Sequence, residues 1–240
     1  MSPSLPLPTN EQIAELAPFE RLGLDAISVV VDAAGADLAL AELARHAVVG
    51  FDTEARPTFR VGEQSEGPHV VQFASAERAW IFPLQHEACR RAVASLLAAP
   101  EPAKVGFGLE GDRSQIERKF GVLPQGVFDL NTLFSHLGYG RSLGARRAVA
   151  LLFQRRFVKS KRMTTSNWST LPLSGGQIIY AANDAWAALR VYLALDRDSR
   201  QLVPEPPPRT PEAERPAPTR RSGAARVRRG RGRRRPPRGT

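Results

Sequence analysis

The sequence predicts an α/β fold with a mixed sheet, and two features of the chain lead to this prediction. Apolar runs of strand length recur along the chain, and segments with helical spacing of apolar residues follow most of them. The runs at 69–75 and 79–84 are separated only by a short polar turn, which is typical of an antiparallel hairpin. Strands that alternate with helices and include an early hairpin favour a mixed sheet flanked by helices.

The individual elements follow from local patterns. Strands are expected at 26–32, 47–54, 69–75, 79–84 and 103–108, with a short one at the start of 127–138. Helices are expected at 38–46, 86–99, 112–120 and in the second part of 127–138. The clearest helix is the last, because Ser174 and Gln177 have capping-box spacing and apolar positions then follow helical periodicity to about Leu195.

Charge divides the chain into a domain and a tail. Of the total net charge of +10, residues 201–240 contribute 12 arginines and 3 glutamates, a net of +9, which leaves about +1 for the other 200 residues. We expect an N-terminal extension at 1–24, a domain at 25–200 and a disordered Pro/Arg-rich tail at 201–240, because this composition cannot form a core. The tail is interpreted as a phosphate-binding or localisation segment, or alternatively as a solubilising extension.

Cysteine content and hydropathy indicate the cellular compartment of the protein. The single cysteine, Cys89, excludes an intrachain disulfide and predicts a reducing, intracellular location, cytoplasmic by default. The arginine run leaves a nuclear location open. No stretch approaches the roughly 20 apolar residues that span a bilayer, so no membrane association is expected. The N-terminus carries no basic residue before Arg21, which argues against a signal peptide.

Two acids stand at the end of the strand expected at 47–54. Asp52 and Glu54 are two residues apart, so strand alternation places both carboxylates on one face. Unpaired carboxylates repel one another and resist burial, and a divalent cation such as Mg²⁺ or Mn²⁺ resolves that conflict. Ordinary composition produces such a pair about once in a chain of this length, so the pair alone is a weak signal.

Three further residues complete a possible catalytic set. Asp112 opens the helix that follows the strand at 103–108, a position that helix capping explains equally well. Tyr180 and Asp184 lie at i and i+4 and share one face of the last helix, where a half-buried aromatic and a solvated acid are the ordinary alternatives. Together, four acids and a phenol indicate two-metal hydrolysis, in which one ion activates water and the other stabilises the leaving 3′ oxygen.

The motifs around these residues resemble a known family. They read VVGFDTEARP around Asp52, KVGFGLEGDRSQI around Asp112 and YAANDAWAALRVY around Tyr180, with SNW and PLS elements before the last. The chain is similar over about residues 25–196 to the DEDD superfamily of 3′–5′ exonucleases, in its tyrosine-containing branch of Werner and ribonuclease D type. The resemblance implies a ribonuclease H-like fold, with a mixed five-stranded sheet flanked by helices.

The resemblance also implies the chemistry. Asp52 would bridge two Mg²⁺ or Mn²⁺ ions, Glu54 and Asp184 would hold the ion on the nucleophile side, and Asp112 would help to hold the other. Tyr180 would orient the attacking water. The implied reaction releases nucleoside 5′-monophosphates from the free 3′ end of a DNA or RNA strand.

Seven further residues are candidates for binding the substrate: Thr53, Phe107, Lys159, Lys161, Arg162, Asn167 and Trp168. The three basic residues would clamp phosphates, or would simply form a solvated loop. The two aromatic rings would stack on a base, although core packing is the favoured explanation for both. Asn167 would donate or accept a hydrogen bond in the site, or form a turn.

Two rival interpretations follow from other features of the chain. Gly106, Gly108 and Gly111 spell the G-x-G-x-x-G pattern of a dinucleotide-binding turn, with Asp129 about 20 residues beyond. Asp112 argues against this interpretation, because it would set a carboxylate beside the pyrophosphate. The other rival is a non-catalytic nucleic-acid-binding protein built on the exonuclease fold.

Overall fold

The structure is a computed structural model that describes residues 6–58, 65–140 and 142–195 of the chain. The chain divides into a unit that spans Met1–Pro206 and a second unit that spans Pro207–Thr240. All described residues belong to the first unit, and the tail predicted at 201–240 lies outside them.

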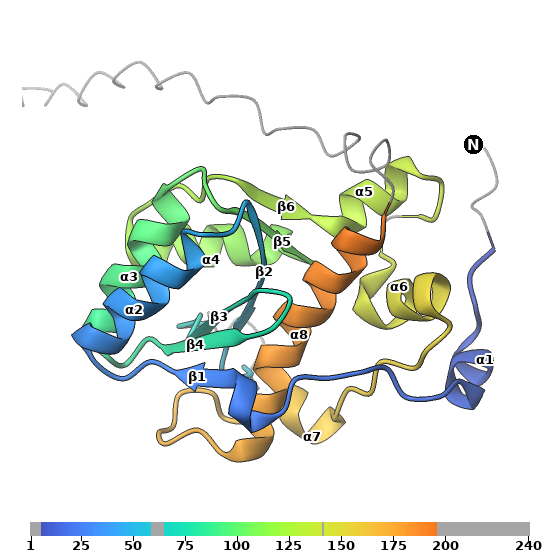
Figure 1. The fold of residues 1–240 in the computed structure, drawn as a ribbon, viewed down its shortest axis with the longest axis horizontal. Helices are drawn as coiled ribbons and strands as arrows, with labels where there is room; N and C mark the ends of the chain where they lie inside the picture. Colours follow the sequence, from blue (N-terminus) through green and yellow to red (C-terminus); the bar gives the residue numbers. More distant parts are fainter. Residues whose placement is uncertain (1–5, 59–64, 141, 196–240) are drawn as a thin grey trace, which may run out of the picture. The chain divides into compact units, whose positions relative to one another are not determined.

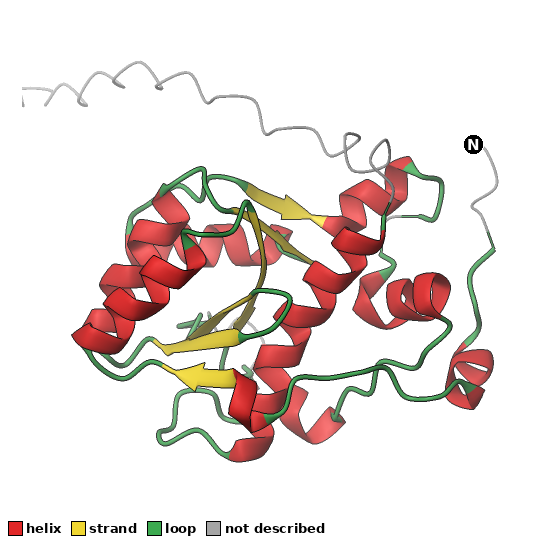
Figure 2. Ribbon diagram, viewed as in Figure 1, coloured by secondary structure: helices red, strands yellow, loops and turns green. Residues whose placement is uncertain are grey.

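A six-stranded mixed sheet forms the centre of this unit (Figures 1 and 2). Its strands, in spatial order, are β1 (Ile27–Val29), β4 (Ala79–Pro83), β3 (Val70–Ala74), β2 (Val48–Glu54), β5 (Ala103–Gly106) and β6 (Val127–Asp129). β3 is antiparallel to both of its neighbours, and the other three pairings are parallel. The mixed sheet, the hairpin and the six strands expected from the local patterns are thus confirmed, whereas the five strands implied by the resemblance are one too few, because the short β1 and β6 both pair with the sheet.

Helices cover both faces of the sheet (Figure 1). One face carries α2 (Ala33–Leu43), α3 (Glu87–Ala98) and α4 (Glu110–Phe120), and the other carries α5 (Leu130–His136), α6 (Gly144–Phe153) and α8 (Gly175–Ala194). Shorter segments are α1 (Asn10–Glu15), the 3₁₀ turn η1 (Leu24–Ala26) and α7 (Lys161–Thr164). The arrangement is the flanked mixed sheet that the sequence predicts.

The central strand β2 separates the two cores by simple alternation. Val49 and Phe51 pack toward α2, α3 and α4, so Gly50 and Asp52 face α8. A Cβ added to Gly50 would lie 2.0 Å from the carbonyl oxygen of Ala185, so only glycine allows the backbone of α8 to approach β2 this closely. This close approach brings the acid on the helix toward the acids on the strand.

The start of α8 follows the predicted capping box. The Ser174 hydroxyl accepts from the backbone N–H of Gln177, and the Gln177 side chain accepts in return from the backbone N–H of Ser174 at 3.0 Å. The helix then runs for 20 residues and contacts β1 to β5. Its fixed start determines which residues face the sheet further along.

The N-terminal residues are attached to this core by specific bonds. The backbone N–H of Leu22 donates to Asn183 Oδ1 at 2.8 Å, and Asn183 Nδ2 donates back to the Leu22 carbonyl at 3.2 Å. Pro18 forms an isolated parallel bridge with Arg156. The stretch before residue 24, although weakly patterned in sequence, is therefore packed in its described part.

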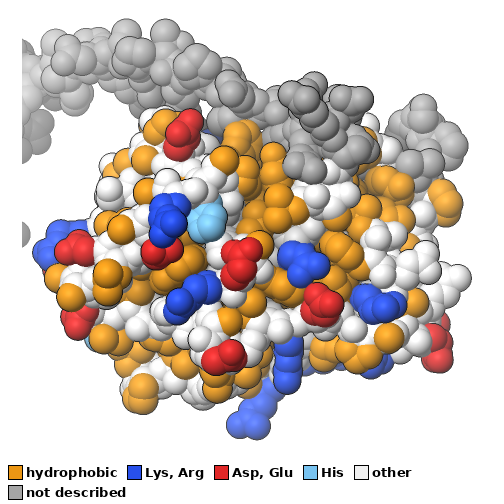
Figure 3. Space-filling model, viewed as in Figure 1, with side chains coloured by type: hydrophobic (Ala, Val, Ile, Leu, Met, Phe, Trp, Pro, Cys, Tyr) orange, Lys and Arg blue, Asp and Glu red, His pale blue; other side chains and the backbone are white. Residues whose placement is uncertain are grey.

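Basic and acidic side chains are mixed on one face of the described part. On the face drawn in Figure 3, Lys and Arg side chains are interspersed with Asp and Glu side chains. Among the described helices, none has both the length and the apolar character needed to cross a membrane.

Candidate active site

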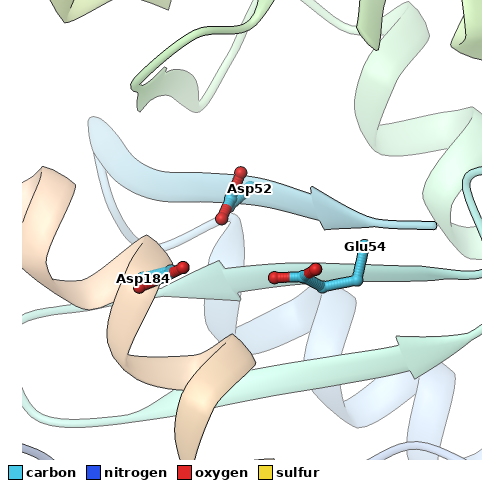
Figure 4. Close-up of side chains that lie close together, drawn as sticks. All are labelled: Asp52, Glu54 and Asp184. Carbon is cyan, nitrogen blue, oxygen red and sulfur yellow. The ribbon is translucent and has the colours of Figure 1, made fainter. Parts of the chain in front are cut away.

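Three of the predicted acids meet between β2 and α8. Asp52 and Glu54 extend from the end of β2, and Asp184 extends from α8 toward them (Figure 4). Each offers one carboxylate oxygen, and these oxygens all lie within 4.8 Å of one another. Asp52 and Glu54 are partly buried, whereas Asp184 is only 6% exposed. Strand alternation predicted that Asp52 and Glu54 share a face, whereas the sequence linked Asp184 to them only through the order of the acids and the family resemblance.

Burial and the charge of Lys159 have opposite effects on the Asp184 carboxylate of this centre. Burial raises the pKa of the Asp184 carboxyl above its ordinary value, and the Lys159 charge opposes that rise. Partial burial of Lys159 disfavours its charged form, but the charges of Asp184 and Asp52 outweigh this effect and raise its pKa. The Lys159 ammonium therefore stays charged and donates to Asp184 Oδ2 at 2.7 Å.

The donor set fits a hard divalent cation. All three groups offer carboxylate oxygens, which are the ligands that Mg²⁺ and Mn²⁺ prefer. Such an ion holds its ligands at about 2.1 Å, so ligands of one ion lie up to roughly 4 Å apart. The observed spacing is close to that span, and the residues present therefore fit a divalent metal.

The fourth acid, Asp112, lies on the helix where the sequence placed it. The helix starts at Glu110, two residues earlier than predicted, so Asp112 is in its first turn. The side chain of Asp112 lies outside the described part of the structure. Its place in the metal centre stays a prediction.

Tyr180 is held one helical turn before Asp184. Its hydroxyl lies 3.1 Å from Thr164 Oγ1, and its ring packs at 6.0 Å from the ring of Trp168. Burial, and then the negative charge of Asp184, raises the pKa of the phenol. The hydroxyl therefore keeps its proton at neutral pH and is available as a hydrogen-bond donor.

The two aromatic candidates for base stacking are packed against other rings. Trp168 is fully buried and supports Tyr180, so it offers no face to a base. Phe107 is partly buried and stacks on Phe134, with ring centroids 6.3 Å apart. The packing alternative that the sequence favoured describes both rings.

The polar candidates have different positions. Among the described basic candidates, Lys159 is hydrogen-bonded to Asp184 in the acidic centre, whereas Lys161 and Arg162 are exposed on α7. Asn167 Oδ1 accepts from the backbone N–H of Ser169 at 3.1 Å, so its side chain forms a local turn. Thr53 lies between the two strand acids, and alternation directs its side chain to the opposite face.

Asp129 is a supporting residue whose role the sequence did not reveal. Its carboxylate accepts from the backbone N–H groups of Gly108 at 3.1 Å, Leu109 at 2.8 Å and Asn131 at 2.8 Å. Leu109 is the N-cap of α4 and provides no capping side chain. Asp129 therefore caps α4 from β6 and fixes the helix that carries Asp112. An acid between a strand and a helix was the only local signal of this role.

The glycine pattern has a packing explanation as well. A Cβ added to Gly106 would lie 2.3 Å from the Phe51 carbonyl oxygen, so this glycine allows β5 to approach β2. Gly108 has a φ of +75°, which favours glycine at the turn into α4. These contacts account for two of the three glycines without a dinucleotide.

A mixed sheet with clustered acids from its central strand and final helix defines an exonuclease-type domain. The family model described as 3′-5′ exonuclease matches residues 27–199, and the chain belongs to that family. The resemblance drawn from the motifs is thereby confirmed.

Individual relatives support the same assignment. A 3′-5′ exonuclease of Arabidopsis thaliana is 30% identical over 151 residues, which cover 62% of this chain and 52% of that protein. The bifunctional 3′-5′ exonuclease/ATP-dependent helicase WRN of Mus musculus is 29% identical over 150 residues, which cover 62% of this chain and 11% of that protein. The chain thus spans about half, or much less, of the length of these relatives.

Solved structures show the same fold. The Nibbler EXO domain of Aedes aegypti has a TM-score of 0.62 and 21% identity, with 78% of this chain and 94% of that chain covered. Ribonuclease D of Trypanosoma brucei in complex with RNA U12 has a TM-score of 0.63 and 21% identity, with 79% and 66% covered. At this identity the likeness confirms the predicted exonuclease fold.

Proposed function

We propose that the protein is a 3′–5′ exonuclease that releases nucleoside 5′-monophosphates from the 3′ end of a nucleic acid strand. The observation that carries the proposal is the meeting of Asp52, Glu54 and Asp184 within 4.8 Å, in a chain that belongs to the 3′-5′ exonuclease family. The catalytic domain would span residues 25–200, and the tail residues 201–240.

The acids would hold two ions, Mg²⁺ or Mn²⁺. Asp52 would bridge them, with Glu54 and Asp184 on the nucleophile side and Asp112 on the other. When bound, the ions would lower the pKa of the attacking water and stabilise the charge of the leaving 3′ oxygen.

Tyr180 and Lys159 would act beside the acids. The Tyr180 hydroxyl, held by Thr164 at 3.1 Å, would orient the attacking water by a hydrogen bond. Lys159 holds Asp184 by a charge-assisted bond at 2.7 Å, and would contact the substrate phosphate when a cation occupies the acids. Neither side chain needs to change its protonation state for these roles.

The substrate would be a DNA or RNA strand with a free 3′ end. The Trypanosoma brucei ribonuclease D structure was solved with RNA, which makes RNA a substrate to test first. The basic tail, with its 12 arginines, would add non-specific phosphate contacts. The single free cysteine, Cys89, is buried and agrees with the proposed intracellular location.

A strand-shortening assay tests this proposal. RNA and DNA oligonucleotides labelled at the 5′ end are incubated with the full chain and Mn²⁺, and the products are separated by size and by chromatography. We expect a ladder that shortens from the 3′ end, nucleoside 5′-monophosphates as products, and no cleavage with a chelator. Circular strands of the same sequence should stay intact, because they have no 3′ end.

Two outcomes would contradict the proposal in different ways. Cleavage of the circular strand would identify an endonuclease. A linear strand that stays intact with Mn²⁺ or Mg²⁺, yet shifts on a gel, would identify the non-catalytic nucleic-acid-binding protein instead.

A further inference from the structure

A buried glutamine without a hydrogen-bond partner lies beside the acidic centre. Gln72 is in the middle of β3 and is 0% exposed. Neither its side-chain nitrogen nor its side-chain oxygen has a hydrogen-bond partner among the described residues. Buried amides are normally paired, so an unpaired one calls for an explanation.

The register of the sheet places Gln72 directly across from Asp52. In the antiparallel pair of β2 and β3, these two residues are opposite partners, so their side chains share one face. The neighbours Val71 and Phe73 pack into the core of α2, α3 and α4, so Gln72 points to the other face. That face carries α8 and the acidic centre.

Apart from Asp52, the residues named here that pack beside Gln72 on this face are apolar. Val70 and Ala74, which flank it along the same face of β3, pack with Ala182 and Ala185 of α8. An apolar residue at position 72 would pack between β3 and α8 without leaving an amide unpaired. The packing therefore does not require a glutamine, and the function of its amide must be sought toward Asp52.

We infer that Gln72 is a positioning residue of the metal centre, whose amide N–H donates to the Asp52 carboxylate when a divalent cation is bound. This inference rests on the proposed function, because it assigns Asp52 as a metal ligand. Carboxylates that bind metals are themselves held by hydrogen bonds, which fix the orientation of their oxygens.

The neutral amide is suited to this task. Lys159 also lies close to the centre, but its positive charge competes with a cation for the carboxylates. The Gln72 amide donates a hydrogen bond without adding charge, so it orients Asp52 and leaves the full negative charge for the metal. The two residues thus have opposite effects on cation binding.

Calorimetric titration of the full chain with Mn²⁺ alone tests the inference without any nuclease assay. We expect Gln72→Met to weaken Mn²⁺ binding by about 10- to 100-fold, which is the usual effect of removing a hydrogen bond to a metal ligand. Gln125→Met, an exposed glutamine in the connection before β6, should bind Mn²⁺ as the parent does. Gln72→Leu offers a second apolar shape if the methionine variant folds poorly.

Thermal unfolding with a chelator separates positioning from packing. Without metal, the apolar variants should be at least as stable as the parent, because they remove an unpaired amide. Weaker Mn²⁺ binding together with undiminished metal-free stability would support the inference. Mn²⁺ affinity within threefold of the parent, or a joint loss of stability and affinity, would overturn it. A parent that binds no Mn²⁺ would instead overturn the proposed function.

Discussion

The ammonium of Lys159 lies 2.7 Å from Oδ2 of Asp184 and places a positive charge inside the acidic centre. Asp184 is buried, and burial alone favours its protonated form. The charge and the hydrogen bond of Lys159 oppose that effect. Lys159 is therefore the counter-ion of Asp184 in the metal-free domain.

Replacing this counter-ion should destabilise the metal-free protein. In Lys159→Met the Asp184 carboxylate loses its partner, and its pKa should rise further. The Lys159 side chain is 38% exposed, so we expect a loss of about 1 kcal/mol in the free energy of unfolding rather than the larger cost of a fully buried pair. Urea unfolding with a chelator measures this loss, and Mn²⁺ should restore most of it.

Lys161→Met provides the matched control for the lysine change. Lys161 is exposed on α7, only two residues along the chain, and its removal should leave stability unchanged. Equal stability of both variants in the chelator would show that the Lys159 charge does not support Asp184.

The cap that Asp129 provides should matter more for activity than an ordinary helix cap. Asp129→Ala removes the acceptor for the N–H groups of Gly108, Leu109 and Asn131, and so frees the starts of α4 and α5. Asp32→Ala removes the equivalent cap of α2, a bond from the Gly35 N–H at 2.8 Å. Each change should cost about 1–2 kcal/mol of stability.

Nuclease rates at a temperature where both cap variants are folded distinguish the two sites. We expect roughly a tenfold loss for Asp129→Ala and none for Asp32→Ala, because only α4 carries Asp112. Equal rates in the two variants would mean that the start of α4 does not position a catalytic group.

Lys104 should make stability depend on pH. Its side chain is fully buried, and Nζ donates to the carbonyls of Ala99 at 2.5 Å and Gln125 at 3.1 Å. Burial lowers its pKa from 10.5 to about 8. Between these values the unfolded chain binds more protons than the folded chain, so stability should rise with pH from about 8 to 10.5 and be lost as pH falls to 8.

Comparison with Lys104→Met isolates the contribution of Lys104 to the pH dependence of stability. The two carbonyl bonds favour the charged lysine, so we expect a rise of about 1–2 kcal/mol rather than the roughly 3 kcal/mol of an uncompensated shift. Urea unfolding at several pH values should show that rise in the parent relative to Lys104→Met. Parallel stability curves for the two proteins would contradict it.

The arginine-rich tail should act on binding and not on chemistry. Deleting residues 204–240 removes most of the net positive charge and should weaken nucleic acid binding, with a flatter dependence on salt. Single-turnover cleavage at saturating protein should stay close to that of the full chain. Unchanged affinity and salt dependence would identify the tail as a solubilising extension.

Local signals in the sequence predicted much of the fold and the acidic centre. The capping box of α8 and the alternation along β2 are short-range patterns, and they located Asp52, Glu54 and Asp184 correctly on their elements. By contrast, α6 begins at Gly144 after Leu143, without a capping side chain, and so gave no start signal.

These local patterns could not predict contacts between segments that are distant in the sequence. The Asp129 bonds to α4 join residues about 20 positions apart, and the bond between Lys159 and Asp184 joins residues 25 apart. The position of Gln72 across from Asp52 depends on the register of β2 and β3, which the separate strands do not reveal. Such relationships follow only once the sheet is assembled.

The most direct test of the account is the Mn²⁺-dependent 3′ shortening of a 5′-labelled strand by Asp52→Ala beside the parent. Losing the carboxylate that we propose to bridge the two ions should remove several kcal/mol of metal-dependent stabilisation, so we predict that the cleavage rate falls roughly 1,000-fold or more. Circular dichroism of the variant should match that of the folded parent. Near-parent, metal-dependent cleavage by folded Asp52→Ala would contradict the assignment of this centre.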